Sequence, residues 1–568
     1  MKYVICFPLL LLFVASCGQS NTTLPDDVVK SIEKRIDQGT NPSIAIGIID
    51  KKGPIYYNFG KKAKNGSAVD QHTIYEIGSI SKVFTAILLA QQVNEGKLKL
   101  DDPIKNYLPA TVKVPKRGTQ EITLGNLSDH TSALPRMPSN FAPADPANPF
   151  ADYTVEQLYA FLSGYELTRD IGSAYEYSNL AQGLLGHLLA LRAGVPYETL
   201  MIRQVASPLR MKETKITFDD NMKKNLAIGH DNGVEVKNWD IPTLAGAGAI
   251  RSSTSDMLKF LAANAGLTKT ALQPAMNLTH QPRHDKAGTM RVGLAWHIAK
   301  GKNGDVIWHN GGTGGYRAFA GFVKETGVGV VVFTNSTESV DDIGFHLLNP
   351  DAPLQEIKAT LAPEMRRTIE AKGVEAAIVL FKDLKKNKPD AYDFSEDFLN
   401  TLGYSYLPKD TKVALALFKF NVDTYPNSSN VYDSYAEALA KDGQRELAIE
   451  NYKKSIALNP GNVQGIAALE KLGVKPTTTE VDVPETTLET YVGTYQLNPG
   501  FDLVVTREGK QLFTQATGQQ RVEVYPSKVN EFFLKVVNAQ LVFNVNGQSV
   551  ESVTLLQNGQ TIVGKRIR

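Results

Sequence analysis

A serine and a lysine stand three residues apart in the segment Ser79-Ile80-Ser81-Lys82. Apolar residues recur with a helical period over residues 80–93, which predicts a helix that begins beside Ser79. Residues i and i+3 share one helix face, so the Ser79 hydroxyl comes within reach of the Lys82 amine. The pair can act as nucleophile and base if burial or nearby positive charge lowers the pKa of Lys82 enough to leave the amine largely neutral near pH 7.

This spacing also occurs wherever a serine caps a helix and an ordinary surface lysine follows. Ser31-Ile32-Glu33-Lys34 has the same pattern in a polar, amphipathic helix, and we assign it no catalytic role. The serine and lysine therefore need support from other parts of the chain.

Tyr177 and Asn179 stand two residues apart in an extended segment that leads into an apolar helix over residues 180–191. Alternate residues of extended backbone point the same way, so both side chains can enter one cleft. A tyrosine there could relay a proton if a nearby ammonium lowers its pKa, and an asparagine could hold a substrate amide. An aromatic residue before a helix is also common as simple packing, so this pair is weak evidence by itself.

Residues 309–315 read His-Asn-Gly-Gly-Thr-Gly-Gly and end a predicted strand. Without side chains at Gly311 and Gly312, a substrate can approach the strand closely, and free backbone N–H groups can stabilise an oxyanion. A phosphate-binding loop would continue with Gly-Lys-Ser/Thr, which is absent here. The G-x-S-x-G elbow of α/β-hydrolases and the H-E-x-x-H zinc motif are absent as well.

The order of these three motifs resembles that of the serine β-lactamase and penicillin-binding-protein superfamily. The resemblance is to the branch of class C β-lactamases, D-alanyl-D-alanine carboxypeptidases and related esterases, and it covers about residues 25–345. Residues 129–135, 207–211 and 246–248 are also similar to that branch.

The resemblance implies that Ser79 attacks a substrate carbonyl, that Lys82 and Tyr177 share the proton transfers, and that Asn179 positions the substrate. It also implies that the backbone N–H groups of Ser79 and Gly312 form an oxyanion hole and that water hydrolyses the acyl-enzyme. Neither a cofactor nor a metal ion is expected.

The third motif departs from the usual Lys-Thr-Gly of lactamases, because His309 stands first and is followed by Asn310 and Gly311. A histidine is mostly neutral at pH 7 and would bind a substrate carboxylate less firmly than a lysine. Arg317 is a candidate for the missing charge.

Three functions remain open from the sequence. The first is an acyl-serine hydrolase for a small peptide, amide or ester, with D-amino-acid or peptidoglycan-like peptides favoured. The second is a class C-type β-lactamase. The third is a non-catalytic, lipid-anchored binding or sensor module that keeps the fold for recognition.

The first 16 residues predict an export signal, since Lys2 precedes an apolar run that is too short to span a bilayer comfortably. Residues 12–18 resemble a bacterial lipobox, which implies lipidation of Cys17 and a tether over residues 17–26; an ordinary signal peptide is the alternative. Cys6 lies in the leader, so the mature chain would have no disulfide. We expect an exported protein, lipid-anchored to a bacterial envelope membrane on the periplasmic side or the cell surface.

The 568 residues are enough for about three or four domains. Residues 27–345 predict an α/β β-lactamase-like domain, with an antiparallel sheet flanked by helices and a mainly helical subdomain. Because its strands fall at both ends of this region, near residues 42–50, 54–60, 292–297, 306–309, 317–322 and 328–333, the sheet should close the chain on itself.

The remainder of the chain predicts two further domains. Residues 346–474 are helical, and a period of about 34 residues resembles tetratricopeptide repeats, which could bind a protein partner. Residues 475–485 predict a linker, and residues 486–568 a small β-barrel or sandwich. A net charge of +2 gives no basic surface for nucleic acid.

Overall fold

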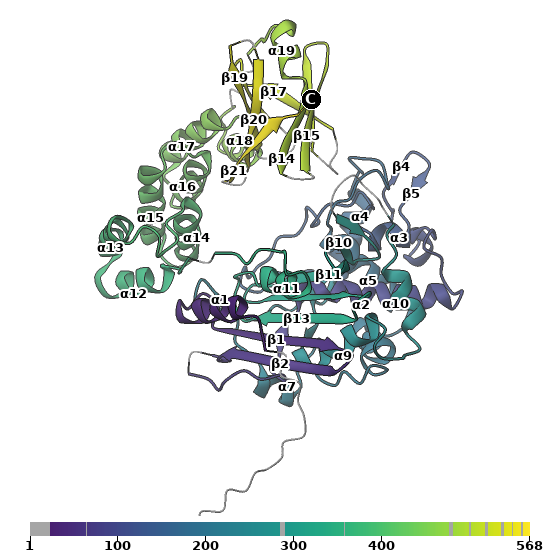
Figure 1. Cartoon of the computed structure of the whole chain (residues 1–568). Helices are drawn as coiled ribbons and strands as arrows, with labels where there is room; N and C mark the ends of the chain where they lie inside the picture. The colour runs from purple at the N-terminus through teal and green to yellow at the C-terminus, as the bar shows by residue number, and fades with distance from the viewer. Residues whose placement is uncertain are drawn as a thin grey trace, which may run out of the picture.

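A computed structural model describes residues 23–63, 65–283, 290–356, 358–475, 481–498, 501–516, 521–534, 539–547, 549–557 and 560–567. The chain forms a sheet-and-helix domain, then a run of helices, then a closed β-barrel (Figure 1). This order agrees with the predicted multidomain layout. The predicted signal peptide, Cys17 and part of the predicted linker lie outside the described residues.

The first domain is built on a seven-stranded antiparallel sheet in the order β2-β1-β13-β12-β11-β10-β9. The N-terminal hairpin pairs with the last strand of the sheet, with Ile46 opposite Val332, so the sheet does close the chain on itself. The strands are β1 (Ser43–Asp50), β2 (Gly53–Gly60), β9 (Met290–Val292), β10 (His297–Gly301), β11 (Gly304–Gly312), β12 (Arg317–Val323) and β13 (Val328–Thr334).

The prediction of one strand over residues 292–297 was wrong. β9 ends and β10 begins at the two limits of that range, and the chain turns between them. Ala295 has a left-handed φ of 63°, and the Gly293 N–H donates to the Trp296 carbonyl at 2.9 Å. The apolar residues of this segment reflect the burial of Trp296 in the core and not a strand.

The two faces of the sheet bury alternate side chains, as the period of a strand requires. One face packs against α1 (Asp26–Asp37) and α11 (Asp341–Leu348) through Ile44, Ile46, Val330 and Val332. The other face packs against α9 (Thr254–Asn264) and the helices beyond it through Ala45, Val331 and Phe333.

Helix α2 (Ser81–Asn94) runs through the middle of the helical layer and is buried on nearly every side, not only along the predicted stripe. Phe84 stacks on Phe260 of α9 with ring centroids 4.3 Å apart. Helix α2 also contacts α5 (Asn179–Ala193), α8 (Ala245–Gly248) and α10 (Gln273–Thr279). Shorter elements complete the domain: α3 (Leu124–Ser128), α4 (Val155–Gly164), α6 (Tyr197–Met201), α7 (Asp220–Asn225), β4 (Lys116–Arg117), β5 (Gln120–Glu121), β6 (His230–Asp231) and β7 (Val234–Glu235).

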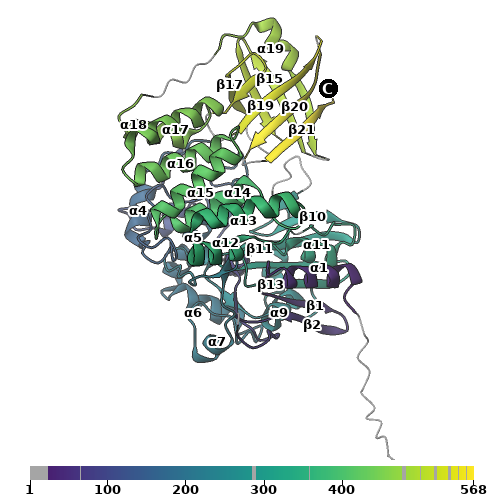
Figure 2. The same ribbon diagram turned by 90° about the vertical axis from the view of Figure 1, so that its left-hand side faces the viewer.

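The middle region consists of successive helices that pack on one another (Figure 2). Phe418 on one helix and Tyr452 on the next-but-one are both buried, as are Ala414 and Ala448, which fits the predicted repeat period. The assignment to tetratricopeptide repeats stays a prediction. The helices are α12 (Ala362–Lys372), α13 (Val374–Asn387), α14 (Glu396–Tyr406), α15 (Thr411–Thr424), α16 (Ser429–Lys441), α17 (Arg445–Leu458) and α18 (Val463–Lys471).

The C-terminal region is a closed barrel, which decides between the predicted barrel and sandwich. It contacts the helical region, because Gln540 Nε2 donates to the Leu458 carbonyl at 2.6 Å. A polar cavity of about 800 Å³ lies between the two regions. The barrel comprises α19 (Glu485–Tyr491), β14 (Gly493–Asn498), β15 (Phe501–Glu508), β16 (Gln511–Ala516), β17 (Val522–Pro526), β18 (Glu531–Phe533), β19 (Ala539–Asn546), β20 (Ser549–Gln557) and β21 (Gln560–Arg566).

Candidate active site

Ser79 lies in a 3₁₀ turn, η1 (Gly78–Ile80), that continues directly into α2. The predicted position at a helix start is therefore correct, although the first turn is tighter than an α-helix. Gly78 has a left-handed φ of 49°, and a Cβ there would lie 2.6 Å from the Gly312 backbone nitrogen. Only glycine fits both conditions, so the backbone fixes where the serine stands.

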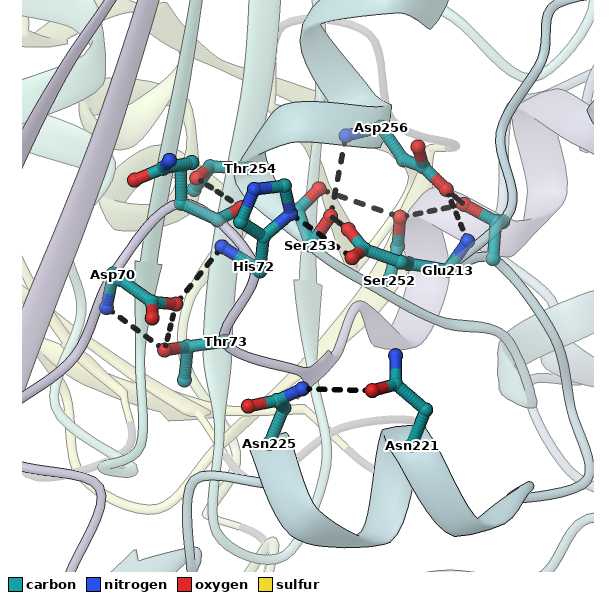
Figure 3. A network of polar contacts seen from close by, with 12 residues as sticks. Asp70, His72, Thr73, Glu213, Asn221, Asn225, Ser252, Ser253, Thr254 and Asp256 are labelled. Atoms are coloured by element: carbon teal, nitrogen blue, oxygen red, sulfur yellow. Dashed lines mark hydrogen bonds and ion pairs between the residues drawn. The ribbon is translucent and has the colours of Figure 1, made fainter. Parts of the chain in front are cut away.

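A network of polar contacts holds the segment before η1 (Figure 3). This segment enters β3 (Tyr75–Glu76), which pairs with β8 (Arg251–Ser252) just before α9. His72 Nδ1 lies 2.9 Å from Glu213 Oε1, and Ser253 Oγ donates to Glu213 Oε2 at 2.6 Å. Ser253 also caps α9 by accepting from Asp256 N–H, so the chain before η1 is joined to the start of a core helix.

Lys82 is completely buried, and its amine has three partners. Nζ lies 2.9 Å from Ser79 Oγ, and it donates to Asn179 Oδ1 at 2.9 Å and to the Ala247 carbonyl at 2.7 Å. Burial, and then the positive charge of Arg136, lower the pKa of Lys82 well below its usual value. Both effects favour the neutral amine, which is the form that a base requires.

Tyr177 and Asn179 both face Lys82. The amine lies 4.8 Å from the centroid of the Tyr177 ring, and the Tyr177 hydroxyl hydrogen-bonds Ser79. Burial nevertheless raises the pKa of Tyr177 to about 12. Burial outweighs the hydrogen bond with Ser79 and the charge of Arg136, which both lower this pKa, so the condition of a lowered tyrosine pKa is not met.

The loop over residues 129–137 is hydrogen-bonded to the start of α5. Ser178, the N-cap of α5, donates its hydroxyl to the Pro135 carbonyl at 2.6 Å, and its backbone N–H donates to His130 Nδ1 at 3.1 Å. The Arg136 carbonyl accepts from the backbone N–H of Asn179 at 3.0 Å. The Arg136 guanidinium consequently lies over the Tyr177 ring, with Cζ 5.1 Å from its centroid.

The third motif lies on β11, where the strand extends past the end of β10. Thr313 N–H donates to the Tyr316 carbonyl, so the alternation of an antiparallel ladder directs the Gly312 N–H away from β12. A Cβ on Gly311 would lie 1.9 Å from the Ile77 carbonyl oxygen and 3.0 Å from the Ser79 nitrogen. The absence of side chains on this strand lets η1 approach it, which brings two candidate oxyanion donors to one place.

His309 is fully buried, and burial lowers its pKa well below the usual value, so the ring is neutral. Its Nδ1 lies 2.6 Å from the Asn310 carbonyl, which can only accept, so Nδ1 carries the proton. His309 stacks on His297 at 5.0 Å, and burial also lowers the pKa of His297, to about 4. The predicted neutrality of this position agrees with its surroundings.

Arg317 lies over Gly312, since a Cβ on that glycine would be 2.8 Å from the guanidinium. The guanidinium donates to the carbonyls of Thr313 and Tyr316, both at 3.0 Å. The charges of Glu338, Asp341 and Asp231 also act on it. The residue is near the oxyanion strand, but carbonyl and carboxylate groups of the protein already surround its charge.

Several residues of the site were assigned no role from the sequence. The Ala247 carbonyl is a backbone atom, and His130, His297 and Tyr175 lie in irregular segments or at a strand end. Residues 129–135 and 246–248 did resemble the family, and extending the first segment by one residue would have included Arg136. Within the described residues, no group of three or more histidine, cysteine, aspartate or glutamate side chains is placed to hold a metal ion.

Comparisons with known proteins agree with this geometry. The β-lactamase family profile matches residues 28–347, and a domain of unknown function (DUF3471) matches residues 477–566. The chain is 28% identical over 344 residues to the D-alanyl-D-alanine-carboxypeptidase/endopeptidase AmpH of Escherichia coli, covering 56% of this chain and 88% of AmpH. It is 29% identical over 351 residues to a β-lactamase of Pseudomonas fluorescens, covering 55% of this chain and 94% of that enzyme.

Solved structures give the same result for the first domain. A class C β-lactamase in complex with cefoxitin is 25% identical, with a TM-score of 0.50 over 56% of this chain and 94% of that enzyme. The range that the family profile matches is more than half of the chain, and it includes the serine, the buried lysine and the glycine strand described above. This chain belongs to the β-lactamase family of serine hydrolases.

Proposed function

We propose that this protein is an envelope-located hydrolase that works through an acyl-Ser79 intermediate on a peptide, amide or ester. D-amino-acid or peptidoglycan-like peptides are the favoured substrates. The observation that carries the proposal is the buried Lys82 amine, 2.9 Å from Ser79 Oγ.

Lys82 acts as the base because its amine is neutral. A neutral amine has two N–H donors and one lone pair. The Ala247 carbonyl and Asn179 Oδ1 accept from the two donors, which leaves the lone pair for the Ser79 hydroxyl. Ser79 attacks the substrate carbonyl as Lys82 accepts its proton.

The backbone N–H groups of Ser79 and Gly312 hold the negative charge that develops on the carbonyl oxygen. Donors of this kind each contribute about 10²- to 10³-fold in rate. Tyr177 keeps its proton at neutral pH, so it gives that proton to the leaving group and regains one from Lys82. Water then hydrolyses the acyl-enzyme, and Asn179 positions the substrate throughout.

The substrate class rests on the relatives. One is a D-alanyl-D-alanine-carboxypeptidase/endopeptidase and another is a β-lactamase, so substrates with a reactive amide fit the site. The membership in an enzyme family also makes the third hypothesis, a binding module without catalysis, the weakest of the three.

The envelope location and the lipid anchor rest on residues 1–16 and on Cys17. Among the helices in the described part of the chain, none combines the length and the apolar character needed to cross a bilayer. We also assign a protein partner to the helical region, which exposes Val379 and Leu447 to 66% and 45%.

A fluorophosphonate or fluorescent β-lactam probe tests the proposal. Mass spectrometry should find the adduct on Ser79, and Ser79→Ala should abolish labelling and lower ester turnover by at least about 10³-fold. Ser31→Ala is the matched control, because it removes the serine of the second S-x-x-K and should change neither readout. Labelling that survives in Ser79→Ala refutes the acyl-Ser79 mechanism.

A β-lactamase activity is the second candidate, and the three motifs in this family favour it. The neutral His309 in place of a lysine argues for slow turnover of β-lactams. Hydrolysis of nitrocefin no faster than that of Ser79→Ala would reject this alternative.

A further inference from the structure

Charges near the reacting groups are few. Lys82 and His309 are both buried, and burial lowers the pKa of each well below its usual value, which disfavours the charged form of each side chain. Arg317 keeps its charge, but two backbone carbonyls hold its guanidinium and three carboxylates lie close by. None of these three residues offers a free cation to an anionic substrate.

Arg136 differs from these three residues in its exposure and in its surroundings. Its side chain is exposed, and no carboxylate in the described ranges forms an ion pair with it. Its charge acts on Lys82, His130 and Tyr177, whereas the charge of Arg317 acts on none of these. Arg136 is therefore an exposed cation whose charge acts on the groups around Ser79.

The backbone fixes Arg136 in this place. Its carbonyl accepts from the N–H groups of Asn179 and Leu180 at 3.0 and 3.2 Å, so the residue is joined to the first turn of α5. The guanidinium lies 5.1 Å from the centroid of the Tyr177 ring. Ser79 and Tyr177 are partly exposed and Gly312 is exposed, so a substrate can approach Ser79 beside the ring on which Arg136 lies.

We propose that Arg136 forms an anion-binding subsite for substrates that carry a free carboxylate. This inference rests on the proposed function. A guanidinium presents a planar fork of N–H donors that matches a carboxylate in a bidentate pair, and its position over an aromatic ring restrains the side chain. The carboxylate is thus recognised from the loop 129–137 and the start of α5, not from β11.

Two pairs of substrates distinguish the part of the substrate that carries the carboxylate. N-acetyl-D-alanyl-D-alanine and its C-terminal amide differ in the leaving group. The phenyl esters of succinylglycine and acetylglycine differ in the acyl part. For each pair, the quantity compared is the kcat/KM of the anionic member divided by that of the neutral member. In Arg136→Gln this ratio should fall about 10- to 100-fold for one of the two pairs, mainly because KM of the anionic member rises.

Arg136→Lys keeps the charge but not the fork, so it should retain part of the ratio. Arg203→Gln removes an exposed arginine of the π-helical segment η3 (Ile202–Ala206) and should leave the ratio as it is in the unaltered chain. A ratio that is unchanged in Arg136→Gln for both pairs overturns the proposal. If the ratio falls in Arg317→Gln but not in Arg136→Gln, the proposal is overturned as well, and the subsite belongs to β12.

Binding to the inactive Ser79→Ala chain gives a readout that needs no turnover. Calorimetry with the same four compounds should show that the anionic member of a pair binds the Ser79→Ala, Arg136→Gln double variant more weakly than it binds Ser79→Ala. If the anionic and the neutral members of both pairs bind Ser79→Ala equally, the subsite is overturned. Absence of turnover for all four compounds in the unaltered chain contradicts the proposed function, and the calorimetry still decides on Arg136.

Discussion

Lys82 shows how one residue type takes different roles in two similar motifs. In Ser31-x-x-Lys34 the lysine side chain is 46% exposed and forms at most a long ion pair with Glu356 at 3.9 Å. In Ser79-x-x-Lys82 the amine is fully buried and has three partners. The spacing is the same, so burial and the neighbouring charge of Arg136 distinguish the buried lysine from the surface lysine.

The protonation of Lys82 predicts the pH dependence of the reaction. Lys82 must be neutral to accept a proton, so kcat/KM should rise as pH increases through the pKa of Lys82, which lies well below its usual value. Arg136 lowers that pKa, so Arg136→Gln should move the rising limb to higher pH. His297, whose pKa is lowered to about 4, is uncharged near pH 7 and gains charge only at the acid end of the profile. Ester hydrolysis measured from pH 4 to 10 tests this, and a limb that moves to lower pH would contradict it.

The sequence predicted four side chains that the structure brings together, and it missed neighbouring groups that act on them. Ser79, Lys82, Tyr177 and Asn179 could be identified because each belongs to a short motif in a regular position. Arg136 and the Ala247 carbonyl could not, because one lies in a loop without periodicity and the other is a backbone atom. The raised pKa of Tyr177 could not be predicted for a related reason, since it depends on burial that only the fold determines.

At the scale of elements, the site depends on the approach of η1 to β11. Two backbone segments pass so closely that neither Gly78 nor Gly311 has room for a side chain. The helix and the strand were both predictable from their apolar periods. Their contact was not, because nothing in either segment specifies its distance from the other.

Gly311→Ala tests this contact. Its Cβ would lie 1.9 Å from the Ile77 carbonyl oxygen, so β11 and η1 must separate and the two oxyanion donors move apart. A displacement of about 1 Å costs roughly 10²-fold in rate, so kcat should fall by at least that factor. Gly164→Ala at the end of α4 is the matched control, since its Cβ would meet no atom within 4 Å. Equal kcat values in both variants would show that the approach is not required.

Another contact between elements joins the first helix of the domain to the last. Arg35 on α1 donates to Asp342 of α11 at 2.5 Å, and the two side chains are 0% and 3% exposed. Arg35→Met leaves a buried carboxylate without its partner and should destabilise the first domain by about 3–5 kcal/mol. Arg35→Met combined with Asp342→Leu should recover most of that loss.

Urea unfolding followed by tryptophan fluorescence measures this difference in the full chain. All three tryptophans, Trp239, Trp296 and Trp308, lie in the first domain, so the signal reports that domain alone. A double variant as unstable as Arg35→Met would show that the missing charge partner is not the cause.

At the scale of the whole molecule, the helical region connects the catalytic domain to the barrel. Gly461, just before α18, lies in the contact with the barrel, where a Cβ would be 2.5 Å from the Leu534 carbonyl oxygen. The alternation of residues in the C-terminal region predicted its strands, but whether they closed into a barrel depended on pairing between distant strands.

Gly461→Ala should loosen the contact between the barrel and the helical region. The radius of gyration from small-angle X-ray scattering should increase, while ester turnover stays within about twofold because distant sites act independently. Gly164→Ala again serves as the control, with an unchanged scattering curve. A loss of turnover comparable to that of Gly311→Ala would mean that the barrel supports catalysis.

The pairing of β1 with β13 has a consequence for biosynthesis. The proposed nucleophile and base are translated early, whereas β11 with the proposed oxyanion donor and β13, the partner of the first hairpin, come much later. Contacts between such distant segments form slowly, because a long loop must close before they stabilise the chain. A nascent chain that ends before β13 therefore holds Ser79 without the means to use it. The fraction of chains labelled covalently at Ser79 would then equal the fraction that has finished folding. Followed over time, this fraction gives the rate at which the protein matures.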